Sequence, residues 1–201
     1  MFVKVCGLRT AGDVRASVDA GADAVGFVFA ESVRRVSVAE AKRLAEDIPD
    51  GVLTVGVFKG ISAEDAAEMT LAAGMGAVQL HGDYPEEAFA VFADLPVRVI
   101  RANVLTAETD VRVGAFGEDL LLLDSKVAGS GEQWDLGLLD NARPEGRWIL
   151  AGGLRPETVA SAIAAARPWG VDVSSGVESS RGVKDPDLIR AFVAAAQSAR
   201  V

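Results

Sequence analysis

The stretch Gly21-Ala22-Asp23-Ala24-Val25-Gly26-Phe27 carries the pattern that decides the fold of this chain. Its first glycine ends a predicted helix, and its apolar residues begin a predicted buried strand. The stretch Gly74-Met75-Gly76-Ala77-Val78 repeats this form further along the chain. Both stretches therefore predict a helix that leads directly into a strand, as in the units of a parallel β/α fold.

The same alternation continues along the whole sequence. Short runs rich in Val, Leu and Phe predict buried strands, and Ala-rich stretches with spaced charges predict helices. The predicted strands are 2–6, 24–29, 53–58, 77–80, 97–102, 120–124, 148–151 and 171–174. The predicted helices are 10–20, 37–47, 62–73, 85–93, 156–166 and 186–199, with a weaker helix over 106–116 and at most a short helical turn over 136–141.

Continuous apolar strands separated by helices favour a parallel sheet that is covered on both faces. Eight such units predict an α/β fold, namely a single (β/α)8 TIM barrel with short loops. A doubly wound open sheet is the alternative. No Pro- or Ser-rich linker divides the chain, so we expect one domain over residues 1–201.

Composition excludes several classes of protein. The chain has 201 residues, half of them apolar, and can bury a full core. Its net charge of -9 disfavours general nucleic-acid binding. A single cysteine excludes an internal disulfide framework and a Cys-based zinc cluster. No apolar run approaches the ~18–20 residues that span a bilayer, and the N-terminus lacks a signal peptide's apolar segment. We therefore expect a cytoplasmic protein without a membrane partner.

In a barrel of this kind, functional residues gather at the carboxyl ends of the strands. Cys6 ends the first strand and is either a base or nucleophile, or a small core residue. His81 follows the fourth strand and is a base, a hydrogen-bond donor or a residue that orients a loop. Asp124 ends the sixth strand, where it is either a proton donor or the ion-pair partner of Lys126.

Other strand ends carry groups that bind anions. Arg34 and Arg35 follow the second strand, and guanidinium groups bind carboxylate or phosphate, although such a pair is also common in solvated loops. Gly152-Gly153 follows the seventh strand, and Ser174-Ser175-Gly176 follows the eighth. Small residues let backbone amides approach an anion, and these two loops form the usual phosphate site of barrel enzymes. The pair predicts phosphate binding.

Seven motifs occur in order over almost the whole chain. They are Lys4-Val5-Cys6-Gly7-Leu8, Gly21 to Phe27, Val78-Gln79-Leu80-His81-Gly82, Leu122-Leu123-Asp124, Gly129-Ser130-Gly131-Glu132 with Trp134-Asp135, Gly152-Gly153-Leu154-Arg155-Pro156-Glu157, and Val171 to Glu178. Together they resemble the phosphoribosylanthranilate isomerases of tryptophan biosynthesis. The chain departs from that family at Ser32-Val33-Arg34, where Ser-Pro-Arg is usual, and at Arg181-Gly182, which replaces Pro-Gly.

The resemblance implies a single-domain barrel without cofactor or metal. It implies an Amadori rearrangement of N-(5-phosphoribosyl)anthranilate to 1-(2-carboxyphenylamino)-1-deoxyribulose 5-phosphate. By resemblance, Asp124 is the general acid that protonates the ribose ring oxygen, and Cys6 is the general base that takes the proton from C2. Arg34 matches the arginine that binds the anthranilate carboxylate, with Arg35 as the alternative. The predicted substrate-binding set is Lys4, Arg34, His81, Gly152, Gly153, Asp172, Ser174, Ser175 and Gly176.

Two other functions compete with this one. The related histidine-pathway isomerase, or a dual-substrate relative, carries an aspartate where Cys6 stands and has a second phosphate site, for which the third and fourth strand ends offer no Gly-rich loop. A non-catalytic phosphosugar-binding barrel would tolerate the loss of Cys6 or Asp124. We expect a small phosphosugar as partner and a monomer or homodimer.

Overall fold

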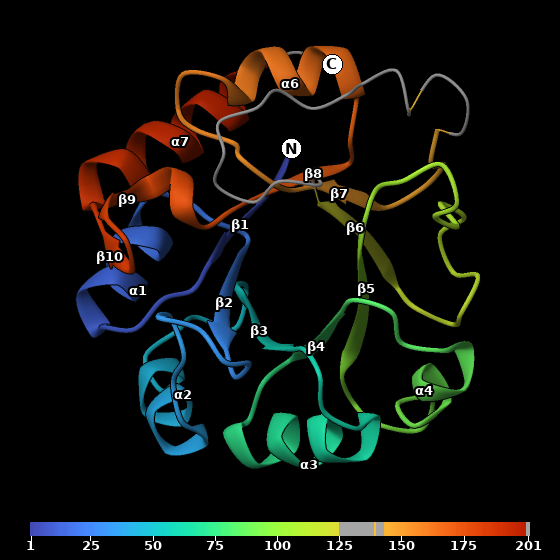
Figure 1. The fold of residues 1–201 in the computed structure, drawn as a ribbon. Helices are drawn as coiled ribbons and strands as arrows, with labels where there is room; N and C mark the ends of the chain where they lie inside the picture. The colour runs from blue at the N-terminus through green and yellow to red at the C-terminus, as the bar shows by residue number, and fades with distance from the viewer. Residues whose placement is uncertain (125–138, 140–142, 200–201) are drawn as a thin grey trace.

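The computed structural model describes residues 1–124, 139 and 143–199. In these residues, eight parallel strands form a closed barrel in which each strand pairs with the next and β8 pairs with β1 (Figure 1). This closure confirms the predicted TIM barrel and excludes the open doubly wound sheet. The strands are β1 (Phe2–Cys6), β2 (Ala24–Val28), β3 (Leu53–Phe58), β4 (Ala77–His81), β5 (Arg98–Val104), β6 (Leu120–Asp124), β7 (Trp148–Leu150) and β8 (Gly170–Val173).

Helices surround the ring of strands (Figure 1). Within the described residues, four of the six α-helices begin at a side chain that accepts a hydrogen bond from an otherwise unpaired backbone amide, as the Ser37 hydroxyl does from the amide of Glu40. The carboxylate of Glu40 accepts a hydrogen bond from the amide of Ser37 in return, which completes a capping box. The helices are α1 (Ala11–Asp19), α2 (Val38–Ala45), α3 (Ala63–Ala73), α4 (Glu86–Ala90), α6 (Val159–Ala166) and α7 (Pro186–Ser198).

The prediction of a weak helix over 106–116 is wrong, because turns occupy this segment. The buried guanidinium of Arg101 donates hydrogen bonds to the carbonyls of Asp110, at 2.8 Å, and Arg112, at 2.7 Å. It also forms an ion pair with Glu118, whose side chain accepts from the amide of Phe116. These contacts from a distant arginine hold the backbone of the segment in turns.

Other predicted boundaries shift by a few residues. Helix α6 begins at Val159 and not at Pro156, since residues 156–158 form a turn in which Thr158 accepts a hydrogen bond from the amide of Arg155. Strand β5 extends to Val104, beyond its predicted end. The helical turn predicted over 136–141 lies outside the described residues except for residue 139.

The apolar core has two layers, as the alternation of side chains along each strand requires. Leu120, Leu122 and Ile149 point into the barrel, while Leu121 and Leu123 pack against the surrounding helices. At the amino end of the barrel, Phe2 and Trp169 stack with ring centroids 4.6 Å apart. The described part of the chain contains no helix that is both long and apolar enough to cross a bilayer.

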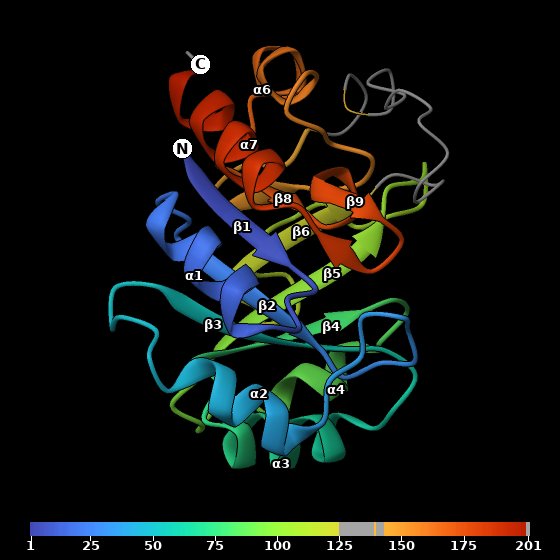
Figure 2. The ribbon, with the colours of Figure 1, turned by 90° about the vertical axis from the view of Figure 1, so that its left-hand side faces the viewer.

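The short elements that follow β8 were not predicted from the sequence. After β8, a short 3-10 helix, η1 (Ser175–Val177), leads into a hairpin of β9 (Glu178–Ser180) and β10 (Val183–Lys184). Figure 2 shows this hairpin on the side of the barrel toward which the strands point. It therefore lies at the end where the predicted site residues gather.

Candidate active site

Strand β1 brings two polar side chains inside the barrel. Lys4 and Cys6 are alternate residues, and both side chains point inward, where Cys6 packs in the interior cluster. Cys6 lies opposite Gly26 of β2 in the strand register. A Cβ atom at Gly26 would lie 2.8 Å from the Cys6 sulfur, so the missing side chain leaves the room that the thiol occupies.

Lys4 and Asp172 form a buried ion pair beside this thiol. Lys4 Nζ lies 2.9 Å from Asp172 Oδ1, and the lysine side chain has no exposed surface. Burial would lower the pKa of Lys4, but the carboxylate of Asp172 and the Cys6 sulfur more than offset it and raise that pKa. The same ion pair therefore holds a permanent positive charge next to Cys6.

The pKa of Cys6 reflects opposing effects. Burial raises it above the ordinary thiol value, since an apolar interior disfavours the thiolate. The ammonium groups of Lys4 and Lys184 lower it, and the carboxylate of Asp172 raises it. The two lysines thus determine how much thiolate this buried cysteine carries at neutral pH.

Two more predicted residues end strands that point toward the same region. Asp124 is the half-buried last residue of β6 and follows four buried leucines. His81 is the half-buried last residue of β4, and its pKa is lowered by burial and by the charge of Lys59. His81 is therefore mostly neutral near pH 7 and able both to donate and to accept a hydrogen bond. The predicted pairing of Asp124 with Lys126, and residues 129–135, lie outside the described residues.

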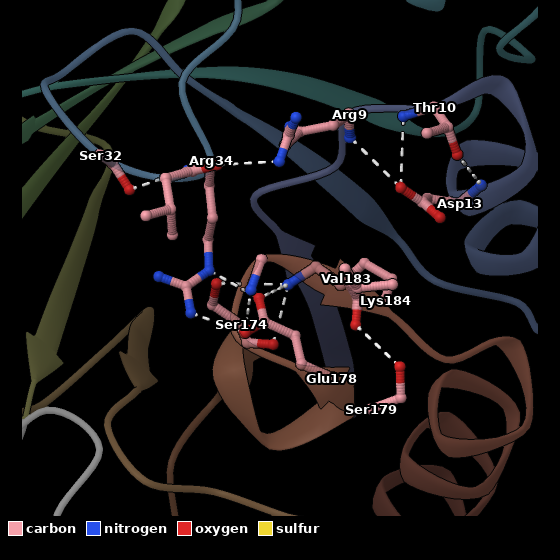
Figure 3. Close-up of polar contacts among 12 residues, drawn as sticks. Arg9, Thr10, Asp13, Ser32, Arg34, Ser174, Glu178, Ser179, Val183 and Lys184 are labelled. Atoms are coloured by element: carbon pink, nitrogen blue, oxygen red, sulfur yellow. Dashed lines mark hydrogen bonds and ion pairs between the residues drawn. The ribbon is translucent and has the colours of Figure 1, made fainter.

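The structure distinguishes the two arginines after β2. Arg35 is exposed, whereas Arg34 is half-buried and points toward the carboxyl end of β1 (Figure 3). Its Cδ atom packs directly over Gly7, where a Cβ atom would lie only 2.7 Å away. Gly7 also has a φ of +77°, which favours glycine over any other residue. These contacts place the guanidinium of Arg34 over the site.

The two predicted phosphate loops touch each other. The backbone of Gly176, in η1, passes so close to the loop after β7 that a Cβ atom would lie 1.8 Å from the carbonyl oxygen of Leu154. Gly152 and Gly153 have φ values of 90° and 66°, which are accessible mainly to glycine. The small residues found in the sequence thus bring two backbone segments side by side at the carboxyl end.

Two residues of this region were missed as site residues. Glu178 and Lys184 belong to the unpredicted hairpin, and both side chains are almost completely buried. Lys184 donates to the carbonyl of Ser174 at 2.8 Å and to Glu178 at 3.0 Å. In the sequence, Glu178 is the last residue of the motif Val171 to Glu178, which was the signal for it. Lys184 belongs to none of the seven motifs.

Comparison with known proteins decides the family. The sequence model of N-(5'-phosphoribosyl)anthranilate (PRA) isomerase matches residues 3–195. The chain belongs to the phosphoribosylanthranilate isomerase family. It is 42% identical to the isomerase of Thermotoga neapolitana over 197 residues, which cover 95% of this chain and 96% of the relative. This result confirms the resemblance read from the motifs.

Solved structures of phosphoribosylanthranilate isomerases agree over the full length. TrpF from Jonesia denitrificans is 46% identical, with a TM-score of 0.92, and the match covers 99% of this chain and 98% of that one. A second isomerase structure, in complex with reduced 1-(o-carboxyphenylamino)-1-deoxyribulose 5-phosphate, is 36% identical, with a TM-score of 0.84 and 98% of both chains covered. The chain is a PRA isomerase of tryptophan biosynthesis, which decides against the histidine-pathway enzyme and the non-catalytic barrel.

Proposed function

We propose that the chain carries out PRA isomerisation with Cys6 as general base and Asp124 as general acid. The observation that carries this assignment is the position of Cys6, the only cysteine, inside the carboxyl end of the barrel beside the buried ammonium of Lys4. A base at this position needs thiolate character, and a neighbouring ammonium stabilises a thiolate. Asp124 ends a strand on the same open side of the barrel, after a run of buried leucines.

The proposed chemistry balances without a cofactor. Asp124 gives its proton to the ribose ring oxygen while the bond from that oxygen to C1 breaks, and the nitrogen lone pair forms a C1=N iminium. The Cys6 thiolate then removes the proton from C2, and the electron pair of that bond neutralises the iminium to give an enolamine. The enol then gives its hydroxyl proton to water while C1 takes a proton from water, which yields the ketone. Proton exchange through water returns Cys6 to the thiolate and Asp124 to the acid. General acid and general base catalysis each contribute about 10²–10⁴-fold to such reactions.

The other predicted residues bind or support the substrate in this proposal. Arg34 binds the anthranilate carboxylate, and its partial burial, against the exposure of Arg35, favours it over its neighbour. Backbone amides of Gly152, Gly153 and the segment from Ser174 to Gly176 bind the phosphate. The contact between these two loops supports a shared phosphate site.

Lys4, Asp172 and His81 have supporting roles. The full burial of Lys4 and its bond to Asp172 favour an effect on Cys6 over direct contact with the substrate. His81 donates or accepts a hydrogen bond as a neutral imidazole. We further infer that residues 1–201 form one domain and act as a monomer or homodimer; the related Thermotoga maritima isomerase is dimeric, and monomers derived from it have been crystallised.

An isomerase assay tests the two catalytic roles. Phosphoribosylanthranilate is generated in place from anthranilate and phosphoribosyl pyrophosphate by a transferase, and the loss of substrate fluorescence is followed. We expect Cys6→Ala to lose nearly all kcat while its circular dichroism and binding of inorganic phosphate match the wild type. A folded Cys6→Ala variant that keeps more than about a tenth of the activity would refute the base assignment.

A further inference from the structure

Glu178 holds the guanidinium of Arg34 by one edge. Arg34 Nε lies 2.6 Å from Glu178 Oε1, and Arg34 Nη2 lies 2.7 Å from Oε2, which is the two-pronged geometry of a strong arginine–carboxylate pair (Figure 3). The two residues are 144 positions apart in the sequence. The pair therefore connects the loop after β2 to the β9–β10 hairpin.

The Glu178 carboxylate is itself held firmly. Besides Arg34, it accepts hydrogen bonds from Lys184 Nζ at 3.0 Å and from the amide of Gly182 at 3.0 Å, so that each oxygen has two donors. Its side chain is 4% exposed. Although burial opposes ionisation, these bonds lower the pKa of Glu178 to about 2, so the carboxylate is charged at any working pH.

Arg34 keeps a second edge for another anion. A guanidinium has five N–H donors, and Glu178 uses one on Nε and one on Nη2. The edge formed by Nη1 and Nη2 carries two parallel N–H groups that fit a second carboxylate. Within residues 1–124, 139 and 143–199, no side chain bonds Nη1 of Arg34. The backbone on the far side of the loop is fixed as well, since Arg9 Nη1 bonds the carbonyl of Val33 at 2.9 Å.

We propose that Glu178 is a positioning residue that orients Arg34 for the ring carboxylate of the substrate, and that Lys184 links this carboxylate subsite to the phosphate loop. The proposal rests on the function proposed above, in which Arg34 binds that carboxylate. The formal charges agree with it, because two cations and one carboxylate leave one positive charge for the substrate carboxylate to neutralise. Lys184 also bonds the carbonyl of Ser174, the residue before η1, so one hairpin fixes both binding subsites.

The test compares two ligands that differ only in the ring carboxylate. The first is reduced 1-(o-carboxyphenylamino)-1-deoxyribulose 5-phosphate, and the second is the same molecule without the carboxyl group. The Kd of the second ligand divided by the Kd of the first, both measured by titration calorimetry, reports how well the enzyme recognises the carboxylate.

Glu178→Gln keeps the volume of the side chain but turns an amide N–H toward Arg34, and Ser179→Ala in the same hairpin is the matched control. The hydroxyl of Ser179 donates a hydrogen bond to the carbonyl of Val183, at 3.4 Å.

We expect Glu178→Gln to reduce the Kd ratio by about ten- to a hundredfold, in line with the loss of a charge-assisted contact, with Kd of the decarboxylated ligand little changed. Arg34→Ala brings the ratio close to one, and Ser179→Ala leaves it at the wild-type value. KM for the substrate rises in Glu178→Gln by more than kcat falls. Glu178→Asp, which keeps the charge, recovers part of the ratio, and it serves as the test variant if Glu178→Gln does not fold.

The possible failures are distinguishable. If Arg34→Ala keeps the wild-type ratio, Arg34 does not bind the carboxylate, and both this inference and that part of the proposed function are wrong. If Arg34→Ala loses the ratio but Glu178→Gln keeps it, only the positioning role of Glu178 is overturned. If Glu178→Gln weakens both ligands equally, Glu178 has a structural role alone, and the inference is again overturned.

Discussion

Replacing Lys4 by Met should raise the pKa of Cys6 and move the activity of the enzyme to higher pH. The ammonium of Lys4 bonds Asp172, and its charge lowers the pKa of Cys6 and so stabilises the thiolate. A unit charge about 4 Å away contributes about 4 kcal/mol at the effective dielectric constant of about 20 that suits protein sites. The variant loses this interaction, so the pKa of Cys6 rises.

The direction of the change in activity follows from the ionisation state in which Cys6 acts as the base. The thiolate is the base, so raising the pKa of Cys6 lowers the thiolate fraction at every pH below that pKa. At neutral pH, kcat/KM should fall by about a hundredfold or more, and it should recover about tenfold for each pH unit as the pH is raised. Asp172→Asn should have the opposite effect, because the carboxylate of Asp172 raises the pKa of Cys6 in the native protein.

Two measurements check this prediction. The pH profile of kcat/KM gives the pKa of the essential base in the free enzyme, and the ultraviolet absorbance of the thiolate gives the pKa of the sulfur itself. Because the chain has one cysteine, Cys6→Ser supplies the baseline for the absorbance. A Lys4→Met variant whose profile stays in place, or moves to lower pH, would refute the reasoning.

The stability of these variants needs a control of its own. Removing one partner of a buried ion pair leaves an uncompensated charge and costs about 3–5 kcal/mol. The double variant with Lys4→Met and Asp172→Asn removes both charges and should regain most of that stability, as thermal unfolding would show. The pKa of Cys6 should lie between those of the two single variants, because the effects of Lys4 and Asp172 on it have opposite sign.

Two further predictions concern the acid and the phosphate site. Asp124→Asn should lower kcat/KM by about 10²–10⁴-fold and remove the alkaline decline of the pH profile, and a folded variant that retains this decline would contradict the acid role. Gly176→Ala would place a Cβ atom 1.8 Å from the carbonyl of Leu154 and so force the two loops apart. We expect weaker binding of inorganic phosphate by calorimetry, with Gly51→Ala, which has nothing within 4 Å of its Cβ position, as the neutral control.

The fold could be predicted because a parallel barrel depends on local patterns. Buried strands flanked by Ala-rich helices are visible in windows of a few residues, and their number and order leave little choice of topology. The positions of Cys6 and Asp124 could be predicted for the same reason, since each is the last residue of a predicted strand and therefore lies at the carboxyl edge. Where a distant side chain intervenes, such patterns fail. The segment 106–116 has a weak helical pattern, but Arg101 binds two of its carbonyls.

The hairpin that carries Glu178 and Lys184 could not be predicted from periodicity. Its strands have three and two residues, which is too short for an alternating pattern to be recognised. The role of Glu178 depends on Arg34, which lies far away in the sequence and approaches only when the barrel closes. Charged residues in a stretch rich in Ser and Gly suggest a solvated loop, and the structure instead buries both side chains.

The buried pair of Lys4 and Asp172 makes better sense as part of the chemistry than as part of the core. Most of the barrel interior is apolar, with Leu120, Leu122 and Ile149 packed in it. An ion pair in such a place contributes little net stability compared with well-packed apolar side chains, because desolvation of two charges offsets their attraction. Stability alone therefore does not account for a fully buried lysine in this barrel. Its position beside the only cysteine does, because the ammonium lowers the pKa of Cys6 against the effect of burial and so increases the fraction of thiolate, the form that acts as a base.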